Sequence, residues 1–193
     1  MKPELRRVRA EVSARHLHLS QADQDKLFGS GHQMKIIKDL SQRGQWAAEE
    51  TLVIRGPKGE FKIRALGPCR SQTQIELSRT DCFALGVPAA LRLSGDLQGT
   101  PGCKLVGPKG EIDLAEGVIV PLRHIHISDA QANERGLKNG DKVRVRLPGV
   151  RSTVFEEVNI RVHPTFDLAL HLDTDEGNAA WADMKGGEGE IVE

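Results

Sequence analysis

The sequence predicts a mainly β protein, in which short strands form β-barrels or a sandwich that a few short helices cap. Three observations favour this class. Gly and Pro, 20 and 9 of the 193 residues, interrupt the chain at short intervals and leave little room for long helices. Tyrosine is absent and aromatic residues make up only 4% of the chain, so Val, Ile and Leu must form the core, which favours strands. Several segments alternate apolar and polar residues, as half-buried strands do.

The predicted strands lie between turns. Residues 52–64 and 104–114 each hold a Gly-Pro-Lys-Gly turn between two apolar stretches, which predicts two hairpins. Two further strands are predicted where apolar and polar residues alternate, at 143–147 and 158–162.

Three short helices are predicted. Ser20 begins the first, over 21–28, and Ser128 begins the second, over 129–135. Each serine can accept a hydrogen bond from the first helical turn, and an Asp or Gln three residues later can return one. The third predicted helix covers 178–184. Helices this short suit caps on a β structure.

Charge and composition exclude several classes of function. Lys and Arg number 27 and Asp and Glu also number 27, so nothing indicates a nucleic-acid partner, whose binding leans on a basic surface. No run of about 18 apolar residues is present, which argues against a membrane-spanning helix. Residues 1–11 are charged and lack the apolar stretch of a signal peptide. We therefore expect a cytoplasmic protein.

The three cysteines, Cys69, Cys82 and Cys103, are far apart in the sequence and form no C-x-x-C pair. This pattern argues against a disulfide framework and against a thiolate zinc site. We expect reduced cysteines with mostly structural roles.

Two segments of the chain repeat one pattern. Residues 13–20 and 121–128 both contain Arg-His-aliphatic-His-aliphatic-Ser, 108 residues apart. The two Gly-Pro-Lys-Gly turns lie only 51 residues apart, so a single tandem duplication cannot explain both repeats. Two related modules with different internal elaborations would explain them, and so would turns that recur because Gly-Pro suits them.

The repeated histidine pairs are the strongest functional signal. On a strand, alternate residues share a face and lie about 6.5 Å apart, so His16 and His18 point the same way, as do His124 and His126. Two imidazoles placed in this way can bind one metal ion. A single pair would more often be structural, but its repetition in one frame favours two metal sites. Each pair precedes a helix N-terminus, a region suited to binding anions.

Each histidine pair needs a further protein ligand. Glu76 and His171 are the two candidates. Arg70, six residues before Glu76, is a candidate for phosphate, because a guanidinium group binds phosphate through two parallel hydrogen bonds. The remaining histidines, His32 and His163, are assigned structural roles.

With these residues in view, the chain resembles the PduL-type phosphotransacylases, or phosphate propanoyltransferases. The resemblance extends from about residue 11 to residue 192, and four blocks in one order and spacing make it specific. These blocks are residues 13–20, Arg70 with Glu76, residues 123–128, and the L-H-L-D-T-D-E-G-N-A-A stretch around His171.

The resemblance implies a fold of two small β-barrels capped by short α-helices, with strand exchange between the two halves of the chain. One barrel would comprise residues 1–14 and 122–193, and the other residues 15–121. The family is at least dimeric, so we expect a homodimer or a higher homo-oligomer.

The resemblance also implies two zinc ions per chain, at the interface between the barrels. His16, His18 and Glu76 would hold the first ion, whose open position would receive the sulfur of coenzyme A. The second ion would be completed by water or phosphate and held by His124, His126 and His171. Arg70 would bind the phosphate.

The sequence departs from the family in two places. Members housed in bacterial microcompartments carry an amphipathic N-terminal extension, whereas residues 1–10 show little such pattern. A microcompartment lumen is therefore less favoured than the cytoplasm. Gly177 stands where the family has Ala, which leaves the proposed ligand His171 intact.

The implied reaction is the reversible conversion of acyl-CoA and phosphate into acyl phosphate and coenzyme A. Zinc would polarise the thioester carbonyl and stabilise the thiolate, while Arg70 would help to orient phosphate. We expect direct transfer without a covalent acyl-enzyme, because no Cys or Ser nucleophile is needed and no Ser-His-Asp order is evident in the sequence.

Other classes remain as alternatives. A metal-dependent thioester hydrolase and a zinc-stabilised ligand-binding module share the same histidine pattern. An amidohydrolase would need a (β/α)₈ barrel of about 250 residues. A cupin would need a Glu four residues after the second histidine, where Ala22 and Ala130 stand. Metal removal separates a structural site, whose loss unfolds the protein, from a catalytic one.

Overall fold

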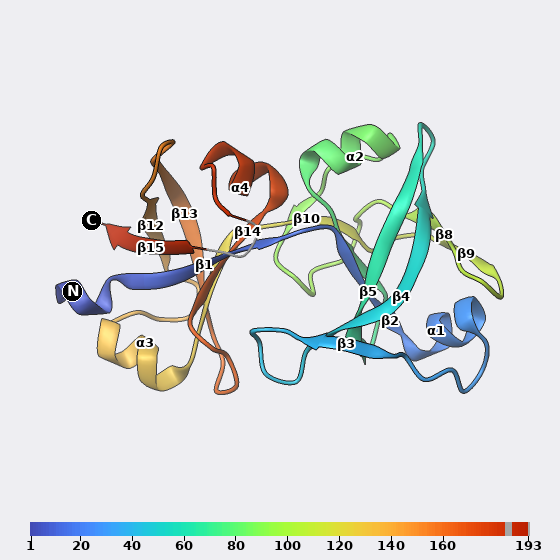
Figure 1. Ribbon diagram of the computed structural model, residues 1–193, viewed down its shortest axis with the longest axis horizontal. Helices are drawn as coiled ribbons and strands as arrows, with labels where there is room; N and C mark the ends of the chain where they lie inside the picture. Colours follow the sequence, from blue (N-terminus) through green and yellow to red (C-terminus); the bar gives the residue numbers. More distant parts are fainter. Residues whose placement is uncertain (184–186, 193) are drawn as a thin grey trace. The chain divides into compact units, whose positions relative to one another are not determined.

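The structure is a computed structural model that describes residues 1–183 and 187–192 (Figure 1). Strands dominate it, with four short α-helices and one 3-10 helix among these residues. The chain divides into two compact units. Unit 1 comprises Met1–Ser13 and Leu122–Glu193, and unit 2 comprises Ala14–Pro121. The predicted mainly β class with short capping helices is confirmed. That these units are the two domains predicted above stays a proposal.

Unit 1 is a closed six-stranded barrel in the order β1-β14-β11-β13-β12-β15. The N-terminal strand β1 pairs in parallel with β14 and antiparallel with β15, so a strand from the start of the chain completes a barrel of its last third. The interior is apolar, and Ile125, Val145 and Ile160 are at most 1% exposed. The elements of unit 1 are η1 (Pro3–Leu5), β1 (Arg7–Ser13), β11 (His124–Ile127), α3 (Asp129–Arg135), β12 (Lys142–Leu147), β13 (Thr153–Val162), β14 (Ala169–Asp173), α4 (Thr174–Ala179) and β15 (Gly187–Val192).

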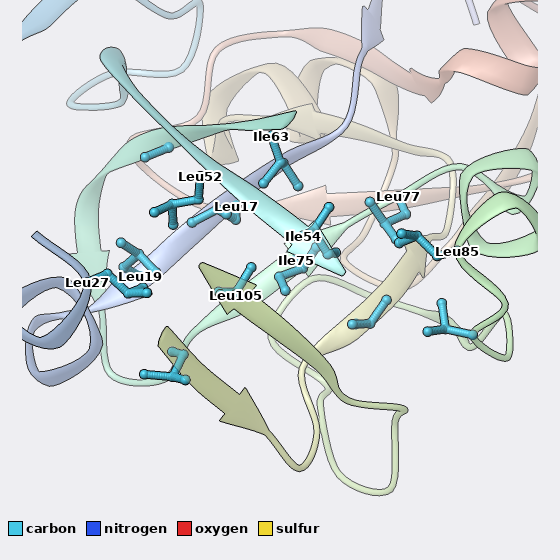
Figure 2. Packing of buried hydrophobic residues seen from close by; sticks show 14 of the residues in the cluster. Leu17, Leu19, Leu27, Leu52, Ile54, Ile63, Ile75, Leu77, Leu85 and Leu105 are labelled. Carbon is cyan, nitrogen blue, oxygen red and sulfur yellow. The ribbon is translucent and has the colours of Figure 1, made fainter. Parts of the chain in front are cut away.

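Unit 2 is a nine-stranded sheet curled into a half-barrel, in the order β7-β10-β6-β2-β5-β4-β8-β9 with β3 paired to β4. Figure 2 shows its core, where side chains such as Leu17, Ile54 and Ile75 pack together. The elements of unit 2 are β2 (His16–Ser20), α1 (Gln21–Phe28), β3 (Ile36–Asp39), β4 (Trp46–Arg55), β5 (Glu60–Arg70), β6 (Gln74–Glu76), α2 (Arg79–Leu85), β7 (Leu91–Arg92), β8 (Cys103–Val106), β9 (Glu111–Leu114) and β10 (Val118–Pro121).

The two Gly-Pro-Lys-Gly turns have equivalent places in unit 2. One joins β4 to β5, and its Lys58 amide donates to Leu85 O at the end of α2; the other joins β8 to β9, and its Lys109 amide donates to Leu27 O at the end of α1. Each turn thus satisfies a carbonyl that its helix leaves without an internal partner. A Cβ on Gly107 would lie 2.5 Å from Leu27 O, so only glycine permits this approach. The recurrence therefore reflects one structural role used twice within a unit.

Each α-helix begins within three residues of the end of a strand. Ser20, Ser78, Ser128 and Asp173 cap α1, α2, α3 and α4, and each side chain accepts a hydrogen bond from the amide three residues later. The helices predicted at 21–28 and 129–135 are confirmed. Sequence reasoning missed α2, although Ser78 and Asp81 form a capping box of the kind used to predict the other two.

The third predicted helix, 178–184, was placed too late in the chain. The helix α4 covers Thr174–Ala179, because the Asp173 carboxylate and the Glu176 side chain form a capping box that begins it earlier. It ends before Trp181, whose φ of 56° is left-handed and cannot continue a helix. Residue 184 lies outside the described residues.

Candidate functional site

Three histidines converge in unit 1. His124 and His126 lie on β11, and His171 lies directly opposite His124 on the antiparallel neighbour β14. One ligand atom from each histidine lies within 4.8 Å of the other two. The ring centroids are 4.5 to 5.2 Å apart. Both residues of the β11 pair are buried, at 7% and 8% exposure. The strand pairing has therefore joined a pair and a single residue, 45 positions apart, into one cluster.

Neighbouring groups orient these imidazoles. His124 Nδ1 lies 2.7 Å from Leu122 O. Because a carbonyl oxygen only accepts, Nδ1 carries the proton and the lone pair lies on Nε2, which is the arrangement found in metal-binding histidines. Glu11 Oε2 lies 3.9 Å from His171 Nδ1, so a carboxylate from β1 faces the outer nitrogen of the third imidazole. Phe166 stacks on His126 at 3.9 Å between ring centroids.

The donor set of this cluster fits zinc. Three imidazoles are a common protein ligand set for Zn²⁺, which prefers tetrahedral coordination. Three protein ligands leave a fourth position for water or substrate, whereas structural zinc sites are closed by four protein ligands.

The second predicted ligand set lies in unit 2. His16 and His18 lie on β2, next to the antiparallel strand β6, and His16 faces Glu76 across the pair. His16 Nε2 is 3.5 Å from Glu76 Oε2. His16 Nδ1 lies 2.9 Å from Ala14 O, which repeats the bond between His124 and the carbonyl two residues before it. The first histidine of each pair thus presents Nε2 in the same way.

This second set is less convergent than the first. His18 Nδ1 lies 3.4 Å from Pro68 O, and the rings of His16 and His18 are 5.8 Å apart. Among the residues that the structure describes, His124, His126 and His171 form the only group of three ligand atoms within 4.8 Å. The structure therefore brings His16, His18 and Glu76 onto adjacent strands, and their role as a metal site stays a proposal.

The surroundings of His18 keep its imidazole uncharged. Burial lowers the pKa of His18 to about 3, and the positive charge of Arg70 adds to this effect. The imidazole is consequently neutral throughout the physiological range, and protons do not compete with a metal for it.

A hydrogen-bonded chain connects Arg70 with Glu76. Arg70 donates from Nη1 to Ser94 Oγ at 3.0 Å. Gln74 Nε2 donates to the same oxygen at 2.8 Å and to Glu76 Oε1 at 2.6 Å. The buried Gln74 is itself held, because its Oε1 accepts from the Gly95 amide at 2.8 Å. The proposed phosphate ligand and a proposed metal ligand therefore share one rigid polar network.

Sequence reasoning did not identify Gln74 and Ser94 as members of this network. A signal for Gln74 exists, because it stands two residues before Glu76 and shares its strand face. Ser94 lies in a turn after β7 and carries no local pattern that would single it out.

The remaining predicted residues lie elsewhere in their units. The three cysteines form no disulfide, as expected. Burial raises the pKa of Cys103 to about 12, which makes it a poor nucleophile. His32 Nε2 lies 2.9 Å from Glu50 Oε1, and His163 Nδ1 lies 2.9 Å from Thr165 Oγ1.

The departure at Gly177 has a local reason. A Cβ at this position of α4 would lie 2.7 and 2.9 Å from the two methyl carbons of Val12 on β1. Glycine therefore lets the helix approach a β-branched neighbour that alanine would displace.

Comparison with known proteins gives one consistent answer. A family model described as phosphate propanoyltransferase matches residues 9–183. A phosphate propanoyltransferase of Citrobacter rodentium is 51% identical over 177 residues, which cover 91% of this chain and 84% of that protein. One from Thermotoga maritima is 49% identical over 171 residues, covering 88% and 81%. A third, from Salmonella typhimurium, is 51% identical over 174 residues, covering 89% and 82%.

None of the helices in the described part of the chain is both long enough and apolar enough to cross a membrane.

Proposed function

The chain belongs to the phosphate propanoyltransferase family, and on this premise we propose that it transfers a short acyl group between coenzyme A and inorganic phosphate. The observation that carries the proposal is the buried cluster of His124, His126 and His171, whose three donors suit an ion with an open coordination position. Its relatives are named for propanoyl transfer, so propanoyl-CoA is the proposed substrate to test first.

Two metal sites per chain are part of the proposal. The first set of ligands is His16, His18 and Glu76, and the second is His124, His126 and His171. Zinc held by these two sets would supply Lewis acidity to the thioester carbonyl and would stabilise the leaving thiolate.

Arg70 is proposed to bind the phosphate. Its guanidinium is held by Ser94, so its orientation does not have to be fixed when phosphate arrives. A phosphate oxygen attacks the carbonyl carbon, the new C–O bond forms, and the C–S bond breaks. The sulfur leaves with the electron pair as the thiolate of coenzyme A, and the product is acyl phosphate.

Direct transfer is favoured over a covalent acyl-enzyme. Burial raises the pKa of both Cys69 and Cys103, which disfavours their thiolates as nucleophiles. Incubation with acyl-labelled coenzyme A thioester followed by denaturation checks this point. Label that stays on the denatured protein at one equivalent would contradict direct transfer.

The test of the function is the release of free thiol from propanoyl-CoA and acetyl-CoA. We expect release that requires phosphate, that a chelator abolishes and that zinc restores. Release without phosphate would indicate a metal-dependent thioester hydrolase instead. No release from a protein shown to contain zinc would favour a zinc-stabilised ligand-binding module.

One further property is proposed from the family resemblance. We propose that the chain assembles as a homodimer or a higher homo-oligomer, which light scattering coupled to size exclusion tests. We propose separately a cytoplasmic location, which fractionation of the producing cell tests.

A further inference from the structure

Each histidine pair is preceded by an arginine with the same surroundings. Arg15, before His16, lies 3.1 Å from Asp81 Oδ1 and stacks over Phe61 at 4.3 Å. Arg123, before His124, lies 3.1 Å from Glu176 Oε1 and over the ring of a phenylalanine of β13 at 5.4 Å. The arginine of the repeated motif therefore makes one type of contact in both units.

The acidic partners occupy equivalent positions too. Asp81 and Glu176 are the third residues of α2 and α4, and each closes a capping box with the residue that begins its helix. In both carboxylates one oxygen accepts from the N-cap amide and the other meets the arginine. The N-caps of these helices lie two residues after Glu76 and His171. Each arginine is consequently bonded to the helix that follows the third proposed ligand of its own unit.

We propose that Arg15 and Arg123 are positioning residues for the metal sites. Each fastens the strand that carries two histidines to the strand and helix that carry the third ligand. The inference rests on the proposed function, because it assigns the arginines a purpose only if these ligands bind metal.

The two ion pairs are better sheltered than the ordinary surface pairs of this protein. The side chains of Arg15 and Asp81 are 41% and 10% exposed, and those of Arg123 and Glu176 are 30% and 21% exposed. Those of Arg144 and Glu156, which join β12 to β13, are 49% and 66% exposed, so the difference lies mainly in the acids. Exposed pairs contribute little to structure, and screening weakens as pairs are withdrawn from solvent. The arginine pairs are therefore able to fix geometry, and the Arg144 pair is a suitable control.

Unit 2 contains a second contact of this kind, with the roles of the two strands exchanged. Here a residue beside the strand of the third ligand is bonded to the helix that follows the histidine pair. Thr73 precedes Gln74 on β6 as Arg15 precedes His16 on β2. Its hydroxyl donates to Asp23 Oδ2 at 2.6 Å, and Asp23 is the third residue of α1. In unit 1 the corresponding residue before β14 is Leu168, whose side chain cannot form such a bond. Replacement of Arg123 should thus have a larger effect than replacement of Arg15.

The effect is expected on metal affinity, because ligand nitrogens must lie within a narrow range of about 2.0–2.1 Å from zinc. Removal of a residue that orients ligands from outside the coordination sphere typically costs about 10–100-fold in metal affinity. We expect a loss of metal affinity of about tenfold, at the lower end of this range, because the arginine acts on the backbone of the ligand strands and not on a ligand itself.

The experiment measures metal binding rather than activity. Zinc content of the unaltered protein is determined first, and cobalt is then titrated into a His16→Ala background, in which its visible spectrum reports the histidine cluster of unit 1. Arg123→Gln is compared with the matched surface variant Arg144→Gln. We expect Arg123→Gln to weaken cobalt binding about tenfold and to shift the spectrum, Arg123→Lys to recover most of the affinity, and Arg144→Gln to change neither.

Glu176→Gln provides a second route to the same pair if Arg123→Gln does not fold. The double variant should bind cobalt little more weakly than the weaker of the two single variants, because the second change removes a contact already lost. Unchanged affinity and spectrum in a folded Arg123→Gln or Glu176→Gln protein would overturn the positioning role alone. Absence of metal from the unaltered protein would instead overturn the proposed zinc site, and this inference with it.

Discussion

His124 and His171 face each other across the antiparallel strands β11 and β14, with their rings stacked 5.2 Å apart. Directly opposite positions on neighbouring strands bring the Cβ atoms of two distant segments to about 4.5–5.5 Å from each other. Since His126 shares the face of His124, this one register assembles three imidazoles. A shift of the register by one residue would turn His171 to the other face of the sheet and separate it from His124 and His126.

Replacement of His126 with alanine should remove one zinc ion per chain and nearly all activity. Loss of a catalytic metal forfeits several kcal/mol of transition-state stabilisation, which corresponds to about 10³-fold or more in rate. Elemental analysis of zinc and the rate of thiol release check this prediction. His163→Ala, which alters a histidine outside the cluster, is the control. Two zinc ions and normal turnover in the His126 variant would show that the cluster is not a metal site.

Replacement of Arg70 with glutamine should chiefly weaken the use of phosphate. A charge-assisted hydrogen bond contributes about 1.5–3 kcal/mol, so kcat/KM for phosphate should fall about 10–100-fold. The KM for acyl-CoA should change far less. Steady-state kinetics with each substrate varied in turn measure both parameters. Equal losses for the two substrates would argue against a specific phosphate role.

The metal-free protein should lose stability in acid through His18. Its pKa lies at about 3 in the folded state, against an ordinary value of 6.5, because of burial and of Arg70. Between these two values the unfolded chain binds more protons than the folded one, so the free energy of unfolding falls as the pH falls. Urea unfolding between pH 7 and pH 4 tests this.

A His18→Asn variant provides the comparison for that titration, since it lacks the ionisable ring. Its free energy of unfolding should depend less steeply on pH over the same range. Parallel curves for the two proteins would mean that His18 does not contribute to the acid sensitivity.

Replacement of Gly177 with alanine should destabilise unit 1, even though alanine favours helices. The new methyl group would meet the two methyl carbons of Val12 at 2.7 and 2.9 Å. Overpacking costs about 1–3 kcal/mol, and the helix preference of alanine over glycine returns about 1 kcal/mol. Thermal unfolding of the zinc-loaded protein measures the net loss. Val12→Ala added to Gly177→Ala should recover it, and a double variant no more stable than Gly177→Ala would contradict the steric explanation.

The parts of the fold that depend on local chemistry were predictable from the sequence. The hairpins at 52–64 and 104–114 follow from their turns, and α1 and α3 follow from Ser20 and Ser128. The same capping rule finds α2 when Ser78, just after a strand, is considered as an N-cap. It finds the true start of α4 when Asp173 is accepted as an N-cap. What one sequence could not supply is the pairing order, because non-local strand contacts leave no local pattern.

In the candidate site, too, the local features were predictable from the sequence and the non-local contacts were not. The paired histidines were evident from alternation along a strand, which is a local property. The contacts of Arg70 with Ser94, and of Arg15 and Arg123 with the acids of α2 and α4, join residues 24 to 66 positions apart. Such contacts follow from the sheet topology, and the repeated arginine of the motif was the one trace of them in the sequence.

The central claim is acyl transfer that depends on two zinc ions, and a metal titration tests it most directly. Zinc is added in steps to metal-free protein, and the formation of acyl phosphate from propanoyl-CoA and phosphate is measured at each step. Our account predicts that formation is absent from the metal-free protein and reaches its maximum when two equivalents per chain are bound. Full formation of acyl phosphate without bound zinc, or with only one equivalent bound, would contradict it.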